Sequence, residues 1–95
     1  MSSGNRQTLS ADGQTTDRQY VGPVRVSLSG DFGGGTAKVE VKDPSDNWID
    51  VAGTSKTSAA DFVIDFAEDA LNDLRVDLSG ATSPALVVWM QSSEK

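Results

Sequence analysis

Apolar and polar residues alternate one by one over much of the chain from Gln19 onward. Three segments show this best, with apolar residues at Val24, Val26 and Leu28, at Ala37, Val39 and Val41, and at Leu74, Val76 and Leu78. A period of two is typical of an antiparallel strand with one buried face. Shorter strands are predicted over Trp48–Val51, Phe62–Phe66 and Leu86–Gln91, separated by turn residues such as Pro44–Asn47. The pattern predicts an all-β fold, a small antiparallel β-sandwich of about seven strands.

One stretch fits two periods. Within Ala60–Leu74, apolar residues also recur at the spacing of a helix, at positions 63, 66, 67, 70, 71 and 74. We expect a strand over Phe62–Phe66 followed by a short helical turn near residues 68–72. A full helix is the alternative.

The first eighteen residues contain few apolar side chains, namely Met1, Leu9 and Ala11. Such a segment has little to bury against the entropy cost of ordering. We therefore divide the chain into an extended polar arm over residues 1–18, a sandwich domain over 19–92 and a polar tail over 93–95. Deleting the arm is expected to leave the domain folded.

A seven-residue segment occurs twice in the sequence in similar form. Val24–Gly30 reads VRVSLSG, and Leu74–Gly80 reads LRVDLSG. Two copies are too few for a solenoid. We expect equivalent strands in the two halves of the sandwich, each ending at a glycine where the chain turns.

The composition excludes several kinds of functional site and partner. The 95 residues form one small domain without cysteine or histidine, so disulfides, thiolate nucleophiles, imidazole bases and zinc sites are excluded. The net charge is −6 and no stripe of basic residues occurs, which disfavours nucleic acid as a partner. No apolar run approaches the roughly 18 residues of a membrane span, so no membrane partner is expected. A small domain with few aromatic anchors is expected to gain stability as a homo-oligomer, with a trimer favoured.

The densest candidate motif is LSGDFGGGTAKVEV, Leu28–Val41, with four glycines in six positions. A phosphate-binding loop needs lysine directly after its last glycine and a helix afterwards, whereas Gly35 is followed by Thr36 and a predicted strand. We interpret the stretch as a hairpin or sheet-corner loop.

The other candidate site residues also favour a structural role over a role in binding or catalysis. Asp43, Asp46, Asn47 and Asp50 offer oxygen ligands for calcium, but their spacing is not that of a calcium loop and suits a solvated turn. The acidic segment Asp61–Asp77 is read as a solvated face rather than a glycosidase acid/base pair. Trp48 and Trp89 are expected inside the core, with sugar stacking as the alternative. We expect no enzymatic activity, no metal and no cofactor.

Several short motifs resemble a small β-sandwich protein found in the virions of tailed bacteriophages. They are V-x-L-S-G at Val26–Gly30, F-x-G-G-T at Phe32–Thr36, W-x-x-V at Trp48–Val51, R-V-x-L-S-G at Arg75–Gly80 and A-T-x-P-x-L at Ala81–Leu86. The resemblance covers about three quarters of the chain, Gly22–Gln91. It carries no catalytic residues.

The resemblance implies a capsid decoration or cement protein that binds the major capsid protein on the outside of the head. The protein would then assemble in the host cytoplasm and reside on the virion surface. We expect the contacts with the capsid to come from the arm, at Asn5, Arg6, Gln7, Thr8 and Leu9. The alternatives are a neck or tail component of the virion and, in a different class, a carbohydrate-binding module that uses Tyr20, Trp48 or Trp89.

Overall fold

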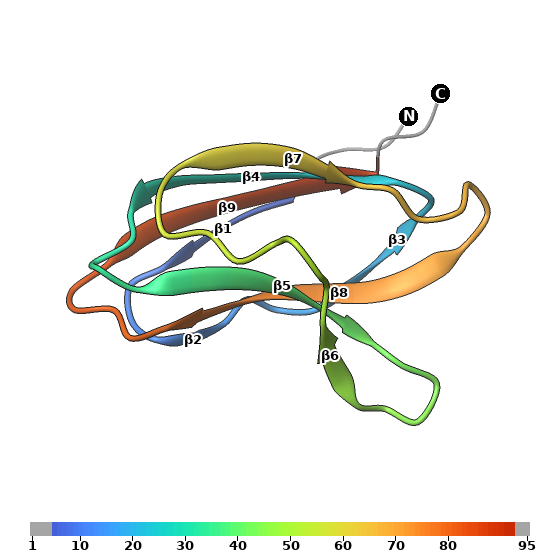
Figure 1. Ribbon diagram of the computed structural model, residues 1–95, viewed down its shortest axis with the longest axis horizontal. Coiled ribbons are helices and arrows are strands. Elements are labelled where there is room, and N and C mark those ends of the chain that lie inside the picture. Colours follow the sequence, from blue (N-terminus) through green and yellow to red (C-terminus); the bar gives the residue numbers. More distant parts are fainter. Residues whose placement is uncertain (1–4, 93–95) are drawn as a thin grey trace.

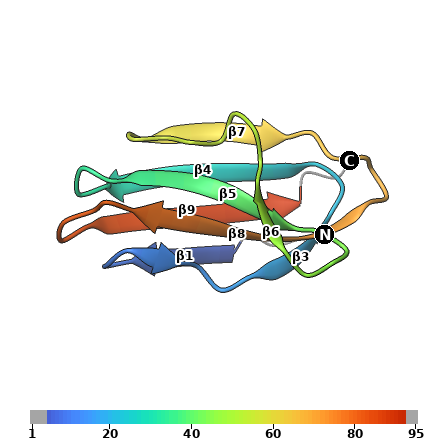
Figure 2. The ribbon, with the colours of Figure 1, turned by 60° about the horizontal axis from the view of Figure 1, so that its bottom comes forward.

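The computed structural model describes residues 5–92, which form nine strands and no helix. The strands are β1 (Asn5–Leu9), β2 (Gly13–Gln14), β3 (Arg18–Val21), β4 (Val24–Asp31), β5 (Thr36–Lys42), β6 (Trp48–Asp50), β7 (Ala60–Ile64), β8 (Leu71–Ser79) and β9 (Ala85–Ser92). Sheet A has the order β1-β9-β4-β7, and sheet B has the order β2-β8-β5-β6, with β3 also paired to β8. All strand pairs are antiparallel, and the two sheets lie face to face (Figures 1 and 2). The predicted all-β antiparallel sandwich is confirmed.

The order of the strands is that of a jelly roll. The pairs are nested along the chain: β1 pairs with β9, β2 and β3 with β8, β4 with β7, and β5 with β6. The pairs β4·β9 and β5·β8 then join these ribbons into two sheets. Counting β2 and β3 as one interrupted strand gives the eight strands of this architecture.

The core lies between the sheets and follows the predicted alternation. The buried apolar side chains are Tyr20, Val24, Val26, Leu28, Phe32, Ala37, Val39, Ile64, Leu74, Val76, Leu78, Leu86, Val88 and Met90. The residues between them point away from the core, so each sheet has an outer face that is open to a partner.

The division into an arm and a domain is wrong for the described residues. β1 pairs along its whole length with β9, from Asn5↔Met90 to Leu9↔Leu86. The chain then crosses to sheet B, where β2 and β3 run along β8 with one extra residue between them, which makes a bulge. A polar segment can do this because an edge strand is held mainly by backbone hydrogen bonds rather than by apolar burial. Residues 1–4 and the predicted tail at 93–95 lie outside the described residues.

The helical turn expected near residues 68–72 is also wrong. A tight turn, in which the amide of Ala70 donates to the carbonyl of Ala67 at 3.1 Å, precedes β8, and β8 already begins at Leu71. Pairing of Val21 with Leu71 and of Tyr20 with Asn72 extends β8 back into this region. The tertiary pairing with β3 overrides the local helical spacing.

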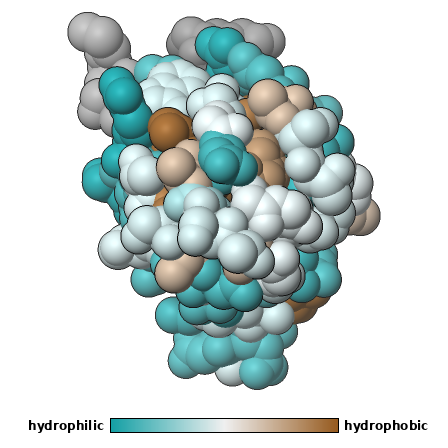
Figure 3. All heavy atoms as spheres, turned by 90° about the vertical axis from the view of Figure 1, so that its left-hand side faces the viewer, coloured by the Kyte–Doolittle hydropathy of each residue, from teal (hydrophilic) through white to brown (hydrophobic). Residues whose placement is uncertain are grey.

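The glycine-rich stretch is a sheet corner, as one of the two predicted alternatives stated. It carries the chain from β4 in sheet A to β5 in sheet B (Figure 1). Gly30 has φ +86°, and a Cβ there would collide with the carbonyl oxygen of Ala85. A Cβ at Gly35 would lie 2.7 Å from the carbonyl oxygen of Ser79. Figure 3, which views this end, shows mostly pale and teal atoms with only scattered brown ones.

The two copies of the repeated segment form equivalent strands, one in each sheet, as predicted. Val24–Gly30 forms most of β4 at the centre of sheet A, and Leu74–Gly80 forms the second half of β8 and its exit from sheet B. Both copies end at a glycine with positive φ, +86° at Gly30 and +73° at Gly80.

Candidate functional site

The outer face of sheet A carries an indole at its centre. Because Leu86, Val88 and Met90 of β9 point into the core, Trp89 points outward. Its cross-strand neighbours are Arg6 on β1 and Ser27 on β4, and Ser27 in turn faces Asp61 on β7. A row of four outward side chains therefore crosses the whole sheet, with a cation at one edge and a carboxylate at the other.

Arg25, also on β4, contacts two members of this row, Trp89 and Asp61. Its guanidinium carbon lies 5.5 Å from the centre of the Trp89 ring, within cation–π range. Its Nη2 and Nε donate to the two carboxylate oxygens of Asp61 at 2.6 and 3.1 Å. These hydrogen bonds, together with the positive charge of Arg25, hold the pKa of Asp61 below its usual value, and the pKa of Arg25 is raised in return.

Two further side chains on the outer face of sheet A are available for contact with a partner. Val63, opposite Arg25 on β7, is 54% exposed, and Arg6 makes no ion pair with another described residue. Tryptophan and arginine are the side chains that most often contribute strongly to protein interfaces. We call the set Arg6, Arg25, Val63, Val87 and Trp89 the sheet-A patch. Its chemistry suits adhesion to a partner with acidic and apolar groups.

On the outer face of sheet B both Lys38 and Arg75 have a carboxylate partner, whereas on sheet A only Arg25 has one and Arg6 makes no ion pair with another described residue. Arg75 Nε donates to Glu40 Oε1 at 2.7 Å, and the Arg75 guanidinium stacks 4.2 Å from the centre of the Trp48 ring. Lys38 pairs with Asp50 at 3.0 Å, and hydrogen bonding to Asp50 raises the pKa of Lys38. These contacts leave less for a partner to satisfy than the sheet-A patch does.

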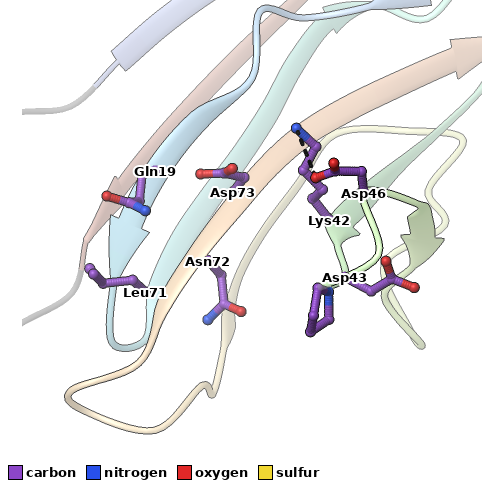
Figure 4. A pocket seen from close by; sticks show the side chains of 8 residues that line it. Gln19, Lys42, Asp43, Asp46, Leu71, Asn72 and Asp73 are labelled. Carbon is purple, nitrogen blue, oxygen red and sulfur yellow. Dashed lines mark ion pairs between the residues drawn. The ribbon is translucent and has the colours of Figure 1, made fainter.

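A shallow groove lies at the end of sheet B, between β3, the start of β8 and the β5–β6 loop (Figure 4). Its volume is about 310 Å³, and its lining residues are Gln19, Lys42, Asp43, Pro44, Asp46, Leu71, Asn72 and Asp73. Lys42 lies 3.9 Å from Asp46 on the same side of the groove, as the dashed line in Figure 4 marks. The groove is open and mainly polar, and Leu71 on its rim is 63% exposed.

Of the calcium candidates, Asp43, Asp46 and Asn47 lie in the turn that the sequence indicated, whereas Asp50 lies at the end of β6. Asp43 Oδ1 accepts the backbone amides of Ser45 and Asn47, both at 2.9 Å, which is an Asx turn. Asp46 faces Lys42 and Asp50 faces Lys38, so the three carboxylates do not converge. Residues 5–92 contain no group of three acidic side chains that could hold a metal ion.

The acidic segment from Asp61 to Asp77 is divided between the two sheets. Asp61 lies on the outer face of sheet A, whereas Asp77 lies on sheet B, where it accepts the side-chain amide of Gln14 at 2.6 Å. Asp61 and Asp77, on opposite faces of the sandwich, therefore cannot act together on one glycosidic bond.

The five residues predicted for partner binding alternate between two roles. Arg6 and Thr8 are exposed on the outer face of β1. Asn5, Gln7 and Leu9 are half-buried and point toward the other sheet. The side-chain amide of Gln7 both accepts from the amide of Thr16 at 2.8 Å and donates to its carbonyl at 3.2 Å, so it ties the two sheets together. Arg6 and Thr8 therefore stay candidates for contact, and the inward three act within the fold.

The prediction that both tryptophans lie in the core is wrong. Trp48 and Trp89 are half-buried on opposite outer faces, each beneath a guanidinium. Strict alternation along Leu86–Gln91 contains the signal that places Trp89 outward, but indole size suggested burial. Tyr20 is in the core at 7% exposure, and this burial raises its pKa.

No family model, curated protein or solved structure matches this chain. Within residues 5–92, no helix is long and apolar enough to cross a membrane.

Proposed function

We propose that the protein is a structural component of a tailed-phage virion, a capsid decoration or cement protein that binds the major capsid protein on the outside of the head. Two features support this function. The motifs that carry the resemblance lie in the central strands β4 and β8, in the β4–β5 and β8–β9 connections, and in the edge strand β6. The jelly roll is also an architecture that viral capsid proteins use, although such an analogy concerns the fold alone.

The observation that carries the proposal is the contrast between the two outer faces. Sheet A presents Trp89 with the exposed Val63 and with Arg6, which makes no ion pair with another described residue, whereas the cations Lys38 and Arg75 of sheet B are held by carboxylates of the same chain. A docking protein needs one face that can exchange water for partner contacts. The sheet-A patch meets that need, and it includes Arg6 from the predicted contact residues.

Sugar binding receives less support from the geometry. Stacking on a pyranose needs an open ring face, but Arg25 lies over Trp89, Arg75 and Lys42 lie near Trp48, and Tyr20 is buried. A glycan would have to displace a guanidinium that also pairs with a carboxylate.

The first test is the copy number in purified virions of the phage that encodes the chain, measured by quantitative mass spectrometry against the major capsid protein. A copy number close to that of the capsid protein supports decoration of the head. A small minority moves the protein to the neck or tail, and complete absence overturns the virion assignment.

The second test locates the docking face. Trp89→Thr and the matched control Trp48→Thr each remove a half-buried indole beneath an arginine, but on opposite sheets. Added to capsid shells that lack the protein, the Trp89→Thr chain is expected to bind at least about tenfold more weakly than wild type, as for an interface hot spot. The Trp48→Thr chain should bind like wild type. Equal loss in both variants would argue against the sheet-A patch.

A further inference from the structure

Sheet A ends in two strands of matching length. β1 and β7 have five residues each and form opposite margins of the sheet, as Figure 2 shows. Among residues 5–92 each has a paired strand on one side only, so the backbone groups on its other side are unpaired within this part of the chain and can accept another strand. β1 and β7 also run in opposite directions, because three antiparallel pairings separate them. If β1 of a second copy were placed beside β7, it would continue the alternation of the sheet.

The side chains agree with such a continuation. Pairing the two strands over their full length sets Arg6 of one copy opposite Val63 of the next, and Thr8 opposite Asp61. Both pairs then lie on the outer face, because positions 6, 8, 61 and 63 are all exposed. Gln7 and Phe62, both half-buried, would meet on the inner face. The register therefore mixes no inward residue with an outward one.

The charges at the two margins are complementary. Val63 sits between Asp61 and the exposed Asp65, which directly follows β7. Arg6 opposite Val63 would lay its aliphatic stem on that side chain and its guanidinium near both carboxylates. Neither Arg6 nor Asp65 makes an ion pair with another described residue. Full-length pairing of β7 with β7 would instead set Asp61 opposite Val63, and pairing of β1 with β1 would set Arg6 opposite Thr8, so neither self-pairing brings Arg6 to a carboxylate of β7.

We propose that copies of this chain associate head to tail, with β1 of one copy adding to β7 of the next so that sheet A runs on from copy to copy. Such a contact uses a different surface on each partner, so the assembly closes into a ring or continues as a fibre. Two five-residue edges bury less than a standard interface, and the association is weak in dilute solution.

The proposal is tested on the purified full-length chain alone, without capsid, by sedimentation velocity over a series of protein and salt concentrations. The wild-type protein is expected to associate as its concentration rises and to dissociate as salt rises. Arg6→Glu and Asp65→Arg should each weaken association by about tenfold. The matched controls Lys42→Glu and Asp46→Arg make the same charge changes at the end of sheet B and should leave association unchanged.

Mixing the two single variants provides the decisive result. In the mixture, the altered position 6 of one chain meets the altered position 65 of the other, and the reverse contact is native. Association is therefore expected to return on mixing. A wild-type protein that stays monomeric up to its solubility limit would overturn the proposal. So would variants that associate like wild type, or a mixture no stronger than its parts.

Discussion

Arg25 and Arg75 hold equivalent positions on opposite faces of the sandwich. Each is the second residue of the repeated segment, each pairs with a carboxylate on a neighbouring strand, and each lies over an indole. Their surroundings differ: the Arg75 and Glu40 side chains are 24% and 11% exposed, whereas those of Arg25 and Asp61 are 52% and 48% exposed. The same local sequence therefore produces a structural ion pair on one face and a solvated pair on the other.

This difference predicts unequal costs for the same substitution. Arg75→Leu leaves the mostly buried Glu40 without its charge partner, and we expect a loss of about 2 kcal/mol in the free energy of unfolding. Arg25→Leu leaves Asp61 in water and should change stability far less. Urea unfolding of the two variants measures both, and a larger loss for Arg25→Leu would contradict this account.

The Arg25–Asp61 pair also predicts a pH effect. Because the pKa of Asp61 is lowered in the folded protein from a reference value of 3.8, the stability that the pair adds is present above that pH and is lost as the pH falls toward the folded pKa. NMR titration should find the Asp61 carboxyl below its reference value, and Arg25→Gln should move it back up. An unchanged titration in Arg25→Gln would show that Arg25 is not the cause.

The glycine corner predicts a contrast between two alanine substitutions. Gly30 and Gly34 both have positive φ, but only at Gly30 would a new Cβ collide with another part of the chain, the Ala85 carbonyl. Gly34→Ala should cost about 1 kcal/mol for the backbone conformation alone. Gly30→Ala should cost clearly more, because the chain at Gly30 must also move away from the start of β9. Thermal unfolding of the two variants compares them directly, and equal losses would exclude a role for the close approach.

The N-terminal strands predict the outcome of a truncation. Deleting residues 1–18 removes β1 and β2 and shortens β3, which exposes the edges of β9 and β8. We expect the truncated chain to lose cooperative unfolding, as measured by circular dichroism during urea titration. Arg6→Ala, which changes only an exposed side chain of β1, should keep it. A truncated chain that unfolds like wild type would mean that the sandwich does not depend on these strands.

The alternating strands, the corner at Gly30–Gly35 and the equivalence of the repeats could be predicted because each depends on residues close in sequence. The role of Asn5–Leu9 could not, since it rests on pairing with Leu86–Met90 at the other end of the chain. The start of β8 at Leu71 has the same origin, because β3 pairs with it across some fifty residues.

The sheet-A patch shows the same limit at the level of a site. Alternation places Trp89 outward, but its neighbours Arg6 and Arg25 come from β1 and β4, and only the register of three strands brings them together. The sequence did not reveal that Asn5–Leu9 forms a strand, so it could not show that Asn5, Gln7 and Leu9 point inward while Arg6 and Thr8 are exposed.

The nested strand pairs also decide how the fold responds to a mechanical load. The first and last strands are neighbours, and Asn5 is paired with Met90, so the points where a pull on the two chain ends would enter the sheet lie side by side. Tension across those points opens the β1·β9 ladder from one end, one hydrogen bond after another, instead of shearing all of its bonds at once. A protein pulled by its two ends should therefore unfold at low force. A load spread over the outer face of sheet A does not pull directly on the β1·β9 pairing.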